Sequence, residues 1–524
     1  MTGMSLRLLA GVAAALVALP ASAQDITVGY GTAVTSIDPH FHNLASNIKL
    51  SIHVFDRLVD QDEKMRPKPA LATEWKAVDD TTWEFKLRPG VKFHDGSEFS
   101  TEDVAASIRR VAWVPNSPSP FTIYTRPIRE TVIVDPLTIR FKTASPYPLM
   151  PVDLASINIV SRKHEQAPTT AFNDGSAMIG TGPFRYVSYA PGDKMELQRN
   201  DAYWGQKPHW SKATIKIITN NASRVAALLA GDVQAIDDVP PTDFVGLKSN
   251  ANVSIVRASA NSVIFMHLDS FRDQSPFVTD KAGQVLQKNP LKDVRVRKAI
   301  SKAMNRQALV ERIMDDTAVP AGGLLAEGFF GVSSKLKPDA FDPDGAKKLL
   351  ADAGYPNGFS LTIHGPNDRY PNDAKVLQAV APMLTRIGIE TKVVSQPWAT
   401  FITQASTPNY AFSAILIGNS ATTGEASFPL RAQVATVDAA KGMGASNRSR
   451  YSNPKVDELL GRAMTTVDDA KREALLQETA EVAMADQALV PLFYQDNIYA
   501  LRKGLTYTGR ADGYLGAFMI RPAN

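Results

Sequence analysis

The sequence predicts an α/β protein in which two lobes enclose a ligand cleft and a small α+β domain is inserted into the first lobe. Two βαβ units carry this prediction, because parallel strands need a crossover helix between them. They occupy residues 213–237 and 360–394, one in each half of the chain. The last predicted strand, 488–494, is expected to return to the first lobe, so that the lobes are joined in the middle.

Short strands and one capped helix fill the first third of the chain. Residues 26–30, 81–88 and 138–143 alternate apolar with other side chains, which is typical of half-buried strands. Ser100 precedes a helical pattern as its N-cap, and Asp103 follows three residues later to complete a capping box. These elements predict the inserted α+β domain.

Turn and cap residues delimit the elements that follow. Pro191, Gly192 and Asp193 separate two strands, and Gly231 ends the helix of the first βαβ unit. A single long amphipathic helix is predicted over 293–314. We also expect helices at 342–354, 373–387, 454–466 and 468–486 and a buried strand at 410–418.

These elements define a domain organisation in which the first lobe is discontinuous. The inserted domain interrupts it, and the C-terminal strand returns to it. The predicted boundaries are 1–23 for a signal peptide, 24–59, 176–270 and 488–524 for the first lobe, 60–175 for the inserted domain and 271–487 for the second lobe.

The N-terminal residues have the features of a cleavable secretory signal peptide. Arg7 supplies a positive charge, Leu8 to Leu19 form an apolar run, and the small residues "ASA" precede Gln24. Twelve apolar residues span about 18 Å as a helix, against the ~30 Å of a bilayer core, so a retained membrane span is not expected. Because Gln24 stands where a lipoprotein carries cysteine, we expect a periplasmic protein without a lipid anchor.

Composition and motifs argue against several classes of protein. The 524 residues include no cysteine, which excludes disulfides, thiolate catalysis and cysteine-ligated metals. The formal net charge of +4, or +3 without Arg7, is small and argues against a nucleic-acid partner. The sequence has no GxSxG, SxxK or phosphate-binding glycine loop, and Asp237 and Asp238 are interpreted as solvated residues at a strand end. We therefore expect neither enzyme activity nor a cofactor.

Two loops follow strands of the second lobe at the edge where open α/β sheets bind ligands. They are "HGPNDRYPND" (364–373) and "GNSATTGEASFPL" (418–430). Arg369 offers a planar five-donor fork for a carboxylate or phosphate, and Tyr370 offers a ring face and a hydroxyl. Arg369 could equally form a surface salt bridge, and the second loop could be a flexible polar segment.

Several long motifs occur in order along the chain. They are "PALATEWKAVDDTTWEFKLRPGVKFHDGSEFSTEDVAAS" (69–107), "GTGPF" (180–184), "DAYWGQKPHW" (201–210), "DVRVRKAISKAMNR" (293–306) and "AKKLLADAGYPNGF" (346–359). In these motifs the chain resembles the extracellular solute-binding proteins of the dipeptide, oligopeptide and nickel type, family 5. The resemblance implies a type II periplasmic-binding-protein fold. Its lobes would close over a small-molecule or peptide-like solute and present it to an inner-membrane ABC permease.

The resemblance also implies which residues contact the solute. In similar peptide-binding members an arginine in the loop matching "DRYPND" grips the peptide carboxylate, and Arg369 stands at that position. Those members hold the free amino group with an aspartate that this chain lacks. Thr422 falls near its place, and Glu425 is the acid close by. We therefore expect an anionic solute without a conventional free N-terminus, such as a modified peptide, an opine-like conjugate or a glutathione-like compound.

Further residues are candidates for the cleft. Trp398 follows the second βαβ unit and could stack on the solute or pack in the core. Asn419 belongs to the loop after the buried strand. Asn447 could face the cleft together with Arg448; alternatively Arg448 is solvated and the segment only leads to the next helix.

Three histidines near the N-terminus raise the alternative of a metal site. They are His40, His42 and His53, but zinc needs three or four ligands and no HExxH motif supplies more. We interpret "DPHFHN" as a turn into a helix that begins near Leu44. The nickel-binding members keep a chelated metal as an alternative solute, and a permease-independent chaperone or peptide-scavenging protein is another alternative. A monomer is expected.

Overall fold

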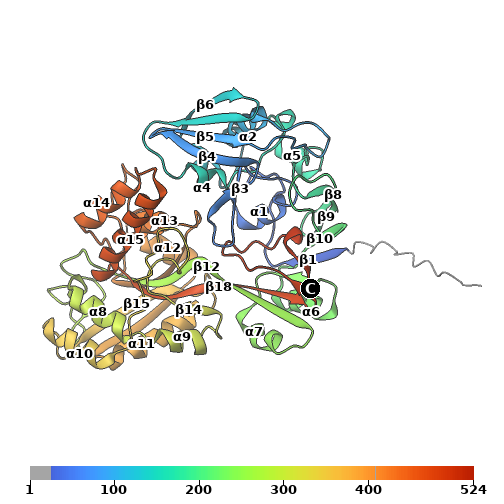
Figure 1. Cartoon of the computed structure of the whole chain (residues 1–524). Coiled ribbons are helices and arrows are strands. Elements are labelled where there is room, and N and C mark those ends of the chain that lie inside the picture. Colours follow the sequence, from blue (N-terminus) through green and yellow to red (C-terminus); the bar gives the residue numbers. More distant parts are fainter. Residues whose placement is uncertain (1–24, 407–408, 524) are drawn as a thin grey trace, which may run out of the picture.

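The computed structural model describes residues 25–406 and 409–523 (Figure 1). The predicted signal peptide, residues 1–23, lies outside the described residues. Within the described ranges, no helix is long and apolar enough to cross a membrane. The chain folds into two α/β lobes and a smaller unit that is drawn in blue and cyan at the top of Figure 1.

One twelve-stranded sheet runs through both lobes, and the order of its strands shows how the lobes are joined. In spatial order the strands are β13 (Val278–Thr279), β15 (Phe359–Pro366), β17 (Ala414–Ser420), β12 (Val253–Leu268), β18 (Val490–Arg502), β11 (Ala235–Ile236), β1 (Ile26–Tyr30), β10 (Lys212–Ile217), β9 (Lys194–Arg199) and β8 (Phe184–Ala190). Two strands lie off this path: β14 (Ala318–Pro320) pairs with β18, and β16 (Ile389–Gln396) pairs with β15.

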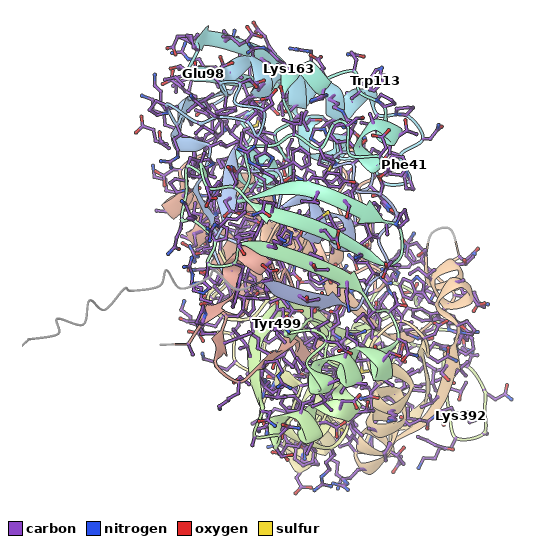
Figure 2. All side chains as sticks on the ribbon, turned by 90° about the vertical axis from the view of Figure 1, so that its right-hand side faces the viewer. Phe41, Glu98, Trp113, Lys163, Lys392 and Tyr499 are labelled. Atoms are coloured by element: carbon purple, nitrogen blue, oxygen red, sulfur yellow. The ribbon has the colours of Figure 1, made fainter. Side chains whose placement is uncertain are left out.

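The first lobe contains the βαβ unit predicted at 213–237. β1 pairs in parallel with both β10 and β11 and thus lies between the two strands of that unit. The crossover helix α6 (Asn221–Ala230) ends at Gly231, whose φ of 90° is a left-handed conformation that suits glycine. β9 and β8 continue the sheet antiparallel, and Figure 2 shows these strands side by side. The other helices of this lobe are α1 (Ala45–Ser51) and α7 (Pro241–Lys248).

The inserted unit has its own antiparallel sheet and its own apolar core. The sheet order is β4 (Ala72–Asp79), β5 (Thr82–Leu87), β7 (Thr138–Thr143) and β6 (Ile128–Asp135). The predicted capping box of α2 (Thr101–Trp113) is confirmed, because the backbone N–H of Ser100 donates to Asp103 Oδ2 at 2.9 Å. Shorter elements in this region are β2 (Val59–Gln61), β3 (Pro67–Pro69), α3 (Thr122–Thr125), α4 (Met150–Leu154), the 3-10 turn η1 (Arg162–His164) and α5 (Thr169–Asn173).

The second lobe contains the other predicted βαβ unit. β15 pairs in parallel with β16 and with β17, and α11 (Asp373–Arg386) connects β15 to β16. Val376, Val380 and Leu384 bury one face of α11 against the sheet, as their spacing predicts. The remaining elements here are η2 (Pro290–Lys292), α10 (Pro343–Asp352), α12 (Trp398–Ala405), α13 (Ser427–Pro429), the π-helical turn η3 (Leu430–Val434), α14 (Pro454–Ala463) and α15 (Asp469–Ala485); β19 (Leu505–Thr506), η4 (Ala517–Met519) and β20 (Arg521–Pro522) follow near the C-terminus.

The single helix predicted over 293–314 is wrong. The structure has two helices there, α8 (Val294–Ala303) and α9 (Arg306–Arg312). Met304 is extended, with ψ of 111°, and the Asn305 side chain accepts the backbone N–H of Ala308 at 3.0 Å as an N-cap. The apolar spacing continues across the break, so the periodicity did not reveal it.

Two long strands, β12 and β18, cross between the lobes. Their antiparallel pairing is interrupted between Ser259 and Val263. On the N-terminal side of this irregularity, β12 pairs with the C-terminal end of β18, which also pairs with β11 of the first lobe. On its C-terminal side, β12 pairs with β17 and β18 pairs with β14, both in the second lobe. Each of these strands therefore has one end in each lobe.

The tip of the β2–β3 hairpin joins the inserted unit to the second lobe. Met65 is 5% exposed and belongs to a second-lobe core cluster together with Phe329. Its neighbour Arg66 places Nη2 3.2 Å from Glu473 Oε1. Only glycine fits at position 424 in this contact, because a Cβ there would lie 2.3 Å from the Cβ of Met65.

Candidate functional site

The two predicted ligand loops leave the same edge of the second-lobe sheet. β15 and β17 are parallel neighbours, with Ile363 opposite Ala414, so the segments that follow them start on the same side. Tyr370 Oη donates a hydrogen bond to the carbonyl of Gly418 at 3.2 Å. This bond ties the first loop to the end of β17.

Backbone contacts hold the loop that carries Arg369. Asp373 Oδ2, at the start of α11, accepts the backbone N–H groups of Arg369 at 3.0 Å and Tyr370 at 3.1 Å. Asp368 Oδ1 accepts the backbone N–H of Trp398 at 2.7 Å and so joins the loop to α12. Arg369 and Trp398 are thereby positioned through their backbone groups, and Tyr370 is positioned both through its backbone and through its hydroxyl.

The Arg369 side chain is exposed and lies beside two aromatic rings. Its Cζ is 5.2 Å from the ring centroid of Trp398 and 6.0 Å from that of Tyr370. The two rings meet edge to face at 6.1 Å and 76°. Across residues 25–406 and 409–523 no carboxylate pairs with this guanidinium. It can therefore bind an incoming carboxylate through two parallel hydrogen bonds.

Trp398 is half-buried, so it both packs on the core and reaches the loop edge. Its ring centroid lies 6.0 Å from that of Phe401. Phe401 stacks on Phe412 at 5.8 Å and 8°, and Phe412 stacks on His364 at 4.1 Å and 18°. A series of rings thus supports the indole beside Arg369, which limits its motion.

Asn419 and Thr422 occupy different environments in the second loop. Thr422 is exposed, whereas Asn419 is half-buried and its Oδ1 accepts from Gln433 Nε2 at 2.9 Å. Asn419 Nδ2 is buried and has no hydrogen-bond partner within the described residues. Asn419 lies near the end of β17 and Thr422 on the loop after it, and both stay candidates for solute contact.

The structure encloses Asn447 within the second lobe, which corrects the expectation that it faces the cleft, whereas Glu425 is buried but lines a cavity of about 410 Å³ together with Trp75 and Pro151 of the inserted unit. Glu425 is 2% exposed and forms a buried ion pair with Arg472, so its carboxylate is not free for an amine. Asn447 is 0% exposed, and its Nδ2 donates to the carbonyls of Ala435 at 2.9 Å and Tyr451 at 2.8 Å. Asn447 therefore holds a loop together.

Arg448 is half-buried rather than solvated, which corrects the alternative in which it faces only water. Its Nη atoms lie 3.3 Å from Ser446 O and Ser406 Oγ, and its Nε finds no partner in the part of the chain that is described. Burial lowers its pKa, while the Tyr370 hydroxyl nearby acts in the opposite sense. Nothing in the sequence around Arg448 signals this position.

The three N-terminal histidines have structural partners. His40 Nε2 lies 2.8 Å from Asn158 O, His42 Nδ1 lies 2.9 Å from Thr35 Oγ1, and His53 Nε2 accepts the backbone N–H of Ala517 at 2.9 Å. Burial lowers the pKa values of His40 and His53 to about 4. Within the described residues no group of three or more His, Asp or Glu side chains is placed to hold a metal.

The corresponding edge of the first-lobe sheet carries a buried ion pair. Asp237, at the end of β11, places Oδ2 2.5 Å from Lys49 Nζ, and its Oδ1 accepts the backbone N–H of Gly31 at 2.8 Å. The interpretation that Asp237 is solvated is wrong, because it is 1% exposed. Its neighbour Asp238 is half-exposed, as expected.

Comparison with known protein families shows to which family this two-lobed chain belongs. A model of the bacterial extracellular solute-binding proteins, family 5 middle, matches residues 66–440, more than half of the chain. The chain is a family 5 solute-binding protein. The resemblance seen in the sequence motifs and the expected type II fold are thereby confirmed.

Other family 5 proteins match along nearly the whole chain. The glutathione-binding protein GsiB of Salmonella paratyphi A is 28% identical over 513 residues, which cover 95% of this chain and 94% of the relative. Among solved structures, HbpA2 from Haemophilus parasuis has a TM-score of 0.83 at 22% identity, covering 96% of this chain and 100% of that chain. The murein tripeptide-binding protein MppA, in an unliganded open form, has a TM-score of 0.81 at 22% identity, with 96% and 98% covered.

Proposed function

We propose that this family 5 protein captures a carboxylate-bearing, peptide-like solute between its lobes and presents it to an inner-membrane ABC permease. The observation that carries the proposal is the exposed guanidinium of Arg369, which has no acidic partner among the described residues and lies 5.2 Å from the Trp398 ring. Such a guanidinium binds carboxylates well, and an aromatic ring beside it favours a flat or apolar group of the same solute. We further propose that the protein acts as a periplasmic monomer without catalytic activity.

Glutathione-like compounds are the solutes that the loop chemistry favours. They carry a carboxylate for Arg369, and because their glutamyl residue is joined through its side chain, its free ammonium group lies beside an α-carboxylate on the same carbon, unlike the N-terminus of an ordinary peptide. The loop after β17 exposes Thr422, while its acid, Glu425, is engaged with Arg472. An ordinary dipeptide therefore lacks an obvious acidic partner for its amino group there. The curated relatives named as glutathione-binding proteins support this choice.

Closure of the lobes over the solute follows from thermodynamics. A solute that contacts both lobes binds the closed state better than the open state, and only this difference can drive closure. The irregular pairing of β12 and β18 between Ser259 and Val263 is the place where we propose that the crossing strands bend. The cores of the lobes would then move as rigid units.

Replacing Arg369 by glutamine tests the proposed site. We expect R369Q to bind glutathione at least about 10-fold more weakly than the unmodified protein, since about 1.4 kcal/mol separates each factor of ten and charged hydrogen bonds contribute about that much or more. Arg386→Gln is the matched control, because Arg386 is also exposed and belongs to the same lobe. Isothermal titration calorimetry of the purified mature protein measures both variants.

Two results would contradict the proposal. One is micromolar binding of an ordinary dipeptide such as Ala-Ala together with no binding of glutathione. The other is an equal affinity of R369Q and the unmodified protein for glutathione. Preferential binding of nickel with histidine over glutathione would favour the chelated-metal alternative instead.

A further inference from the structure

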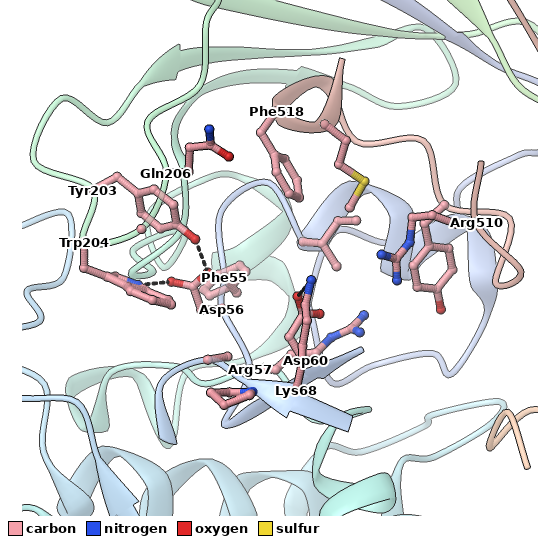
Figure 3. A pocket seen from close by; sticks show the side chains of 16 residues that line it. Phe55, Asp56, Arg57, Asp60, Lys68, Tyr203, Trp204, Gln206, Arg510 and Phe518 are labelled. Carbon is pink, nitrogen blue, oxygen red and sulfur yellow. Dashed lines mark hydrogen bonds and ion pairs between the residues drawn. The ribbon is translucent and has the colours of Figure 1, made fainter. Parts of the chain in front are cut away.

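A cavity of about 230 Å³ lies between the first lobe and the β2–β3 hairpin, beside the C-terminal segment (Figure 3). Its walls come from residues within 52–70, 203–206 and 510–519, and it shares no lining residue with the Arg369 site. Figure 3 shows aromatic and charged side chains surrounding the same space. The charged side chains on its walls are Asp56, Arg57, Asp60, Lys68 and Arg510.

Most of these charged groups already have protein partners. Asp56 accepts from Trp204 Nε1 at 2.7 Å and from Tyr203 Oη at 3.0 Å, as Figure 3 shows. Lys68 Nζ lies 3.2 Å from Asp60 Oδ2. Arg510 pairs with Asp512 at 2.5 Å. Lys68 and Arg510 are thus paired with carboxylates, whereas Asp56 is held by neutral donors.

Arg57 is the exception. Its residue is 6% exposed, yet no hydrogen bond or ion pair joins its side chain to any described residue. Its Nε is buried and lacks a partner. The nearest recorded interaction is with the ring of Tyr514, whose centroid lies 5.7 Å from Cζ. The charge of Arg57 helps to lower the pKa of Asp60 in the same wall, but no hydrogen bond joins its guanidinium to a carboxylate of the described residues.

The other buried arginines show that this is unusual for the protein. Seven arginines are buried in the described part of the chain, and the six besides Arg57 all donate hydrogen bonds through their guanidinium groups. Arg110, for example, donates to both oxygens of Asp38 at 2.9 and 2.8 Å, and Arg224 donates to the carbonyls of Ile218 and Asp238. The remaining four are Arg297, Arg306, Arg472 and Arg510.

A buried charge without a partner is costly, because desolvation is not repaid by pairing. Arg57 also faces a space that can hold a small molecule. We propose that this cavity binds a small solute whose carboxylate pairs with the guanidinium of Arg57. The inference goes beyond the proposed capture of solute at Arg369 and does not depend on it.

The other side chains that line the cavity favour a free amino acid as the solute. Asp56 also lines the cavity and accepts hydrogen bonds from neutral donors, so it would attract an ammonium group next to the carboxylate, a group that phosphate and acetate lack. The volume is below the ~300 Å³ at which pockets for drug-sized ligands begin. Phe518 and Met519 add apolar surface for an aliphatic side chain.

Calorimetric titration of the mature protein with L-leucine tests this inference, with acetate and inorganic phosphate as comparison probes. We expect L-leucine to bind more tightly than acetate and phosphate not to bind. Arg57→Gln should weaken L-leucine binding at least 10-fold, and Arg57→Lys should weaken it less because the charge is kept. Arg386→Gln serves again as the control. Glutathione binding by R57Q should stay unchanged, which separates this site from the one at Arg369.

The inference is overturned if L-leucine gives no heat and does not occupy the cavity in crystals soaked with it. It is also overturned if R57Q and the unmodified protein bind L-leucine equally, or if phosphate binds more tightly than L-leucine. Should R57Q fail to fold, the soaked crystals of the unmodified protein decide the matter, because carboxylate density at Arg57 supports the site and its absence rejects it.

Discussion

The buried carboxyl group of Asp153 should make the stability of the protein depend on pH. It is 4% exposed, and Tyr147 Oη donates to its Oδ2 at 2.5 Å. Burial raises its pKa to about 8; the Tyr147 bond lowers that pKa, and the charge of Glu425 from the second lobe raises it. The carboxyl group is therefore still protonated in the folded protein at a pH where it would be ionised in the unfolded chain.

This difference predicts that Asp153 makes the protein less stable as the pH rises. An unfolded aspartate titrates near pH 3.9, so between about pH 4 and pH 8 the folded state holds a proton that the unfolded state has lost. The free energy of unfolding should fall across this window relative to Asp153→Asn, by a few kcal/mol at about 1.4 kcal/mol per pKa unit. Urea denaturation at pH 4, 6 and 8 measures the difference.

Asp174 provides a control of opposite sign. Hydrogen bonds from Ser176 lower its pKa, so the ionised form is favoured by folding. Asp174→Asn should therefore lose stability relative to the unmodified protein as the pH rises toward about 4, where an unfolded aspartate titrates, and the difference should stay constant from about pH 4 to pH 8. If D153N and the unmodified protein respond to pH identically, the burial of an ionisable Asp153 carboxyl is refuted.

Individual site residues differed in how far the sequence could place them. Arg369 was predictable because it follows a strand of a βαβ unit, and the ends of parallel strands share one edge. Asn447 belongs to an equally polar loop, but the loop folds around it, and its side chain donates hydrogen bonds to the carbonyls of Ala435 and Tyr451. Arg57 gave no local signal, since the cavity around it includes Trp204 and Arg510, which are distant in the chain.

Among the elements, the start of a helix was predicted correctly where an N-cap residue stands directly before the first residues with helical apolar spacing. α2 begins after Ser100, as predicted. The break between α8 and α9 was missed, because Asn305 caps a second helix while the apolar spacing runs on. β12 was not predicted at all. Its second-lobe end is buried on both faces, with Ile264 and Met266 in one core cluster and Val263 in another, whereas its first-lobe end is mostly half-buried, so the strand shows no clear alternation.

At the tip of the β2–β3 hairpin, we expect the apolar contact of Met65 to contribute more to the free energy of unfolding than the ion pair of Arg66. Met65→Ala should lower the free energy of unfolding by about 2–5 kcal/mol, because it empties part of a second-lobe core. Arg66→Gln should lower it by at most ~1 kcal/mol, because the Arg66 and Glu473 side chains are 42% and 29% exposed and water screens the pair. Urea denaturation of both variants is the measurement. An effect of Met65→Ala no larger than that of Arg66→Gln would mean that the tip is not part of that core.

At the scale of the whole molecule, two crossing strands and one hairpin tip connect otherwise separate cores. The first lobe, the inserted unit and the two faces of the second-lobe sheet each have their own apolar cluster. A rotation of one lobe against the other therefore needs few side chains to repack. Such an arrangement favours hinge motion over internal rearrangement.

Solute binding should therefore change the overall dimensions of the protein. We expect small-angle X-ray scattering to show a smaller radius of gyration with saturating glutathione, and no change with Ala-Ala. R369Q should need at least about 10-fold more glutathione for the same change, in line with its weaker binding. Identical scattering with and without glutathione, under conditions where calorimetry shows binding, would contradict closure.

The sequence by itself determined the local elements, the two βαβ units, the family and the loop that carries Arg369, because these depend on spacing and short motifs. Only the tertiary structure decided which polar residues are free. Glu425 is neutralised by Arg472 and Asn447 is enclosed by its own loop, whereas Arg57 is buried without a partner. The physical reason is that a charge or amide becomes a binding group or a structural one according to neighbours brought together from distant parts of the chain.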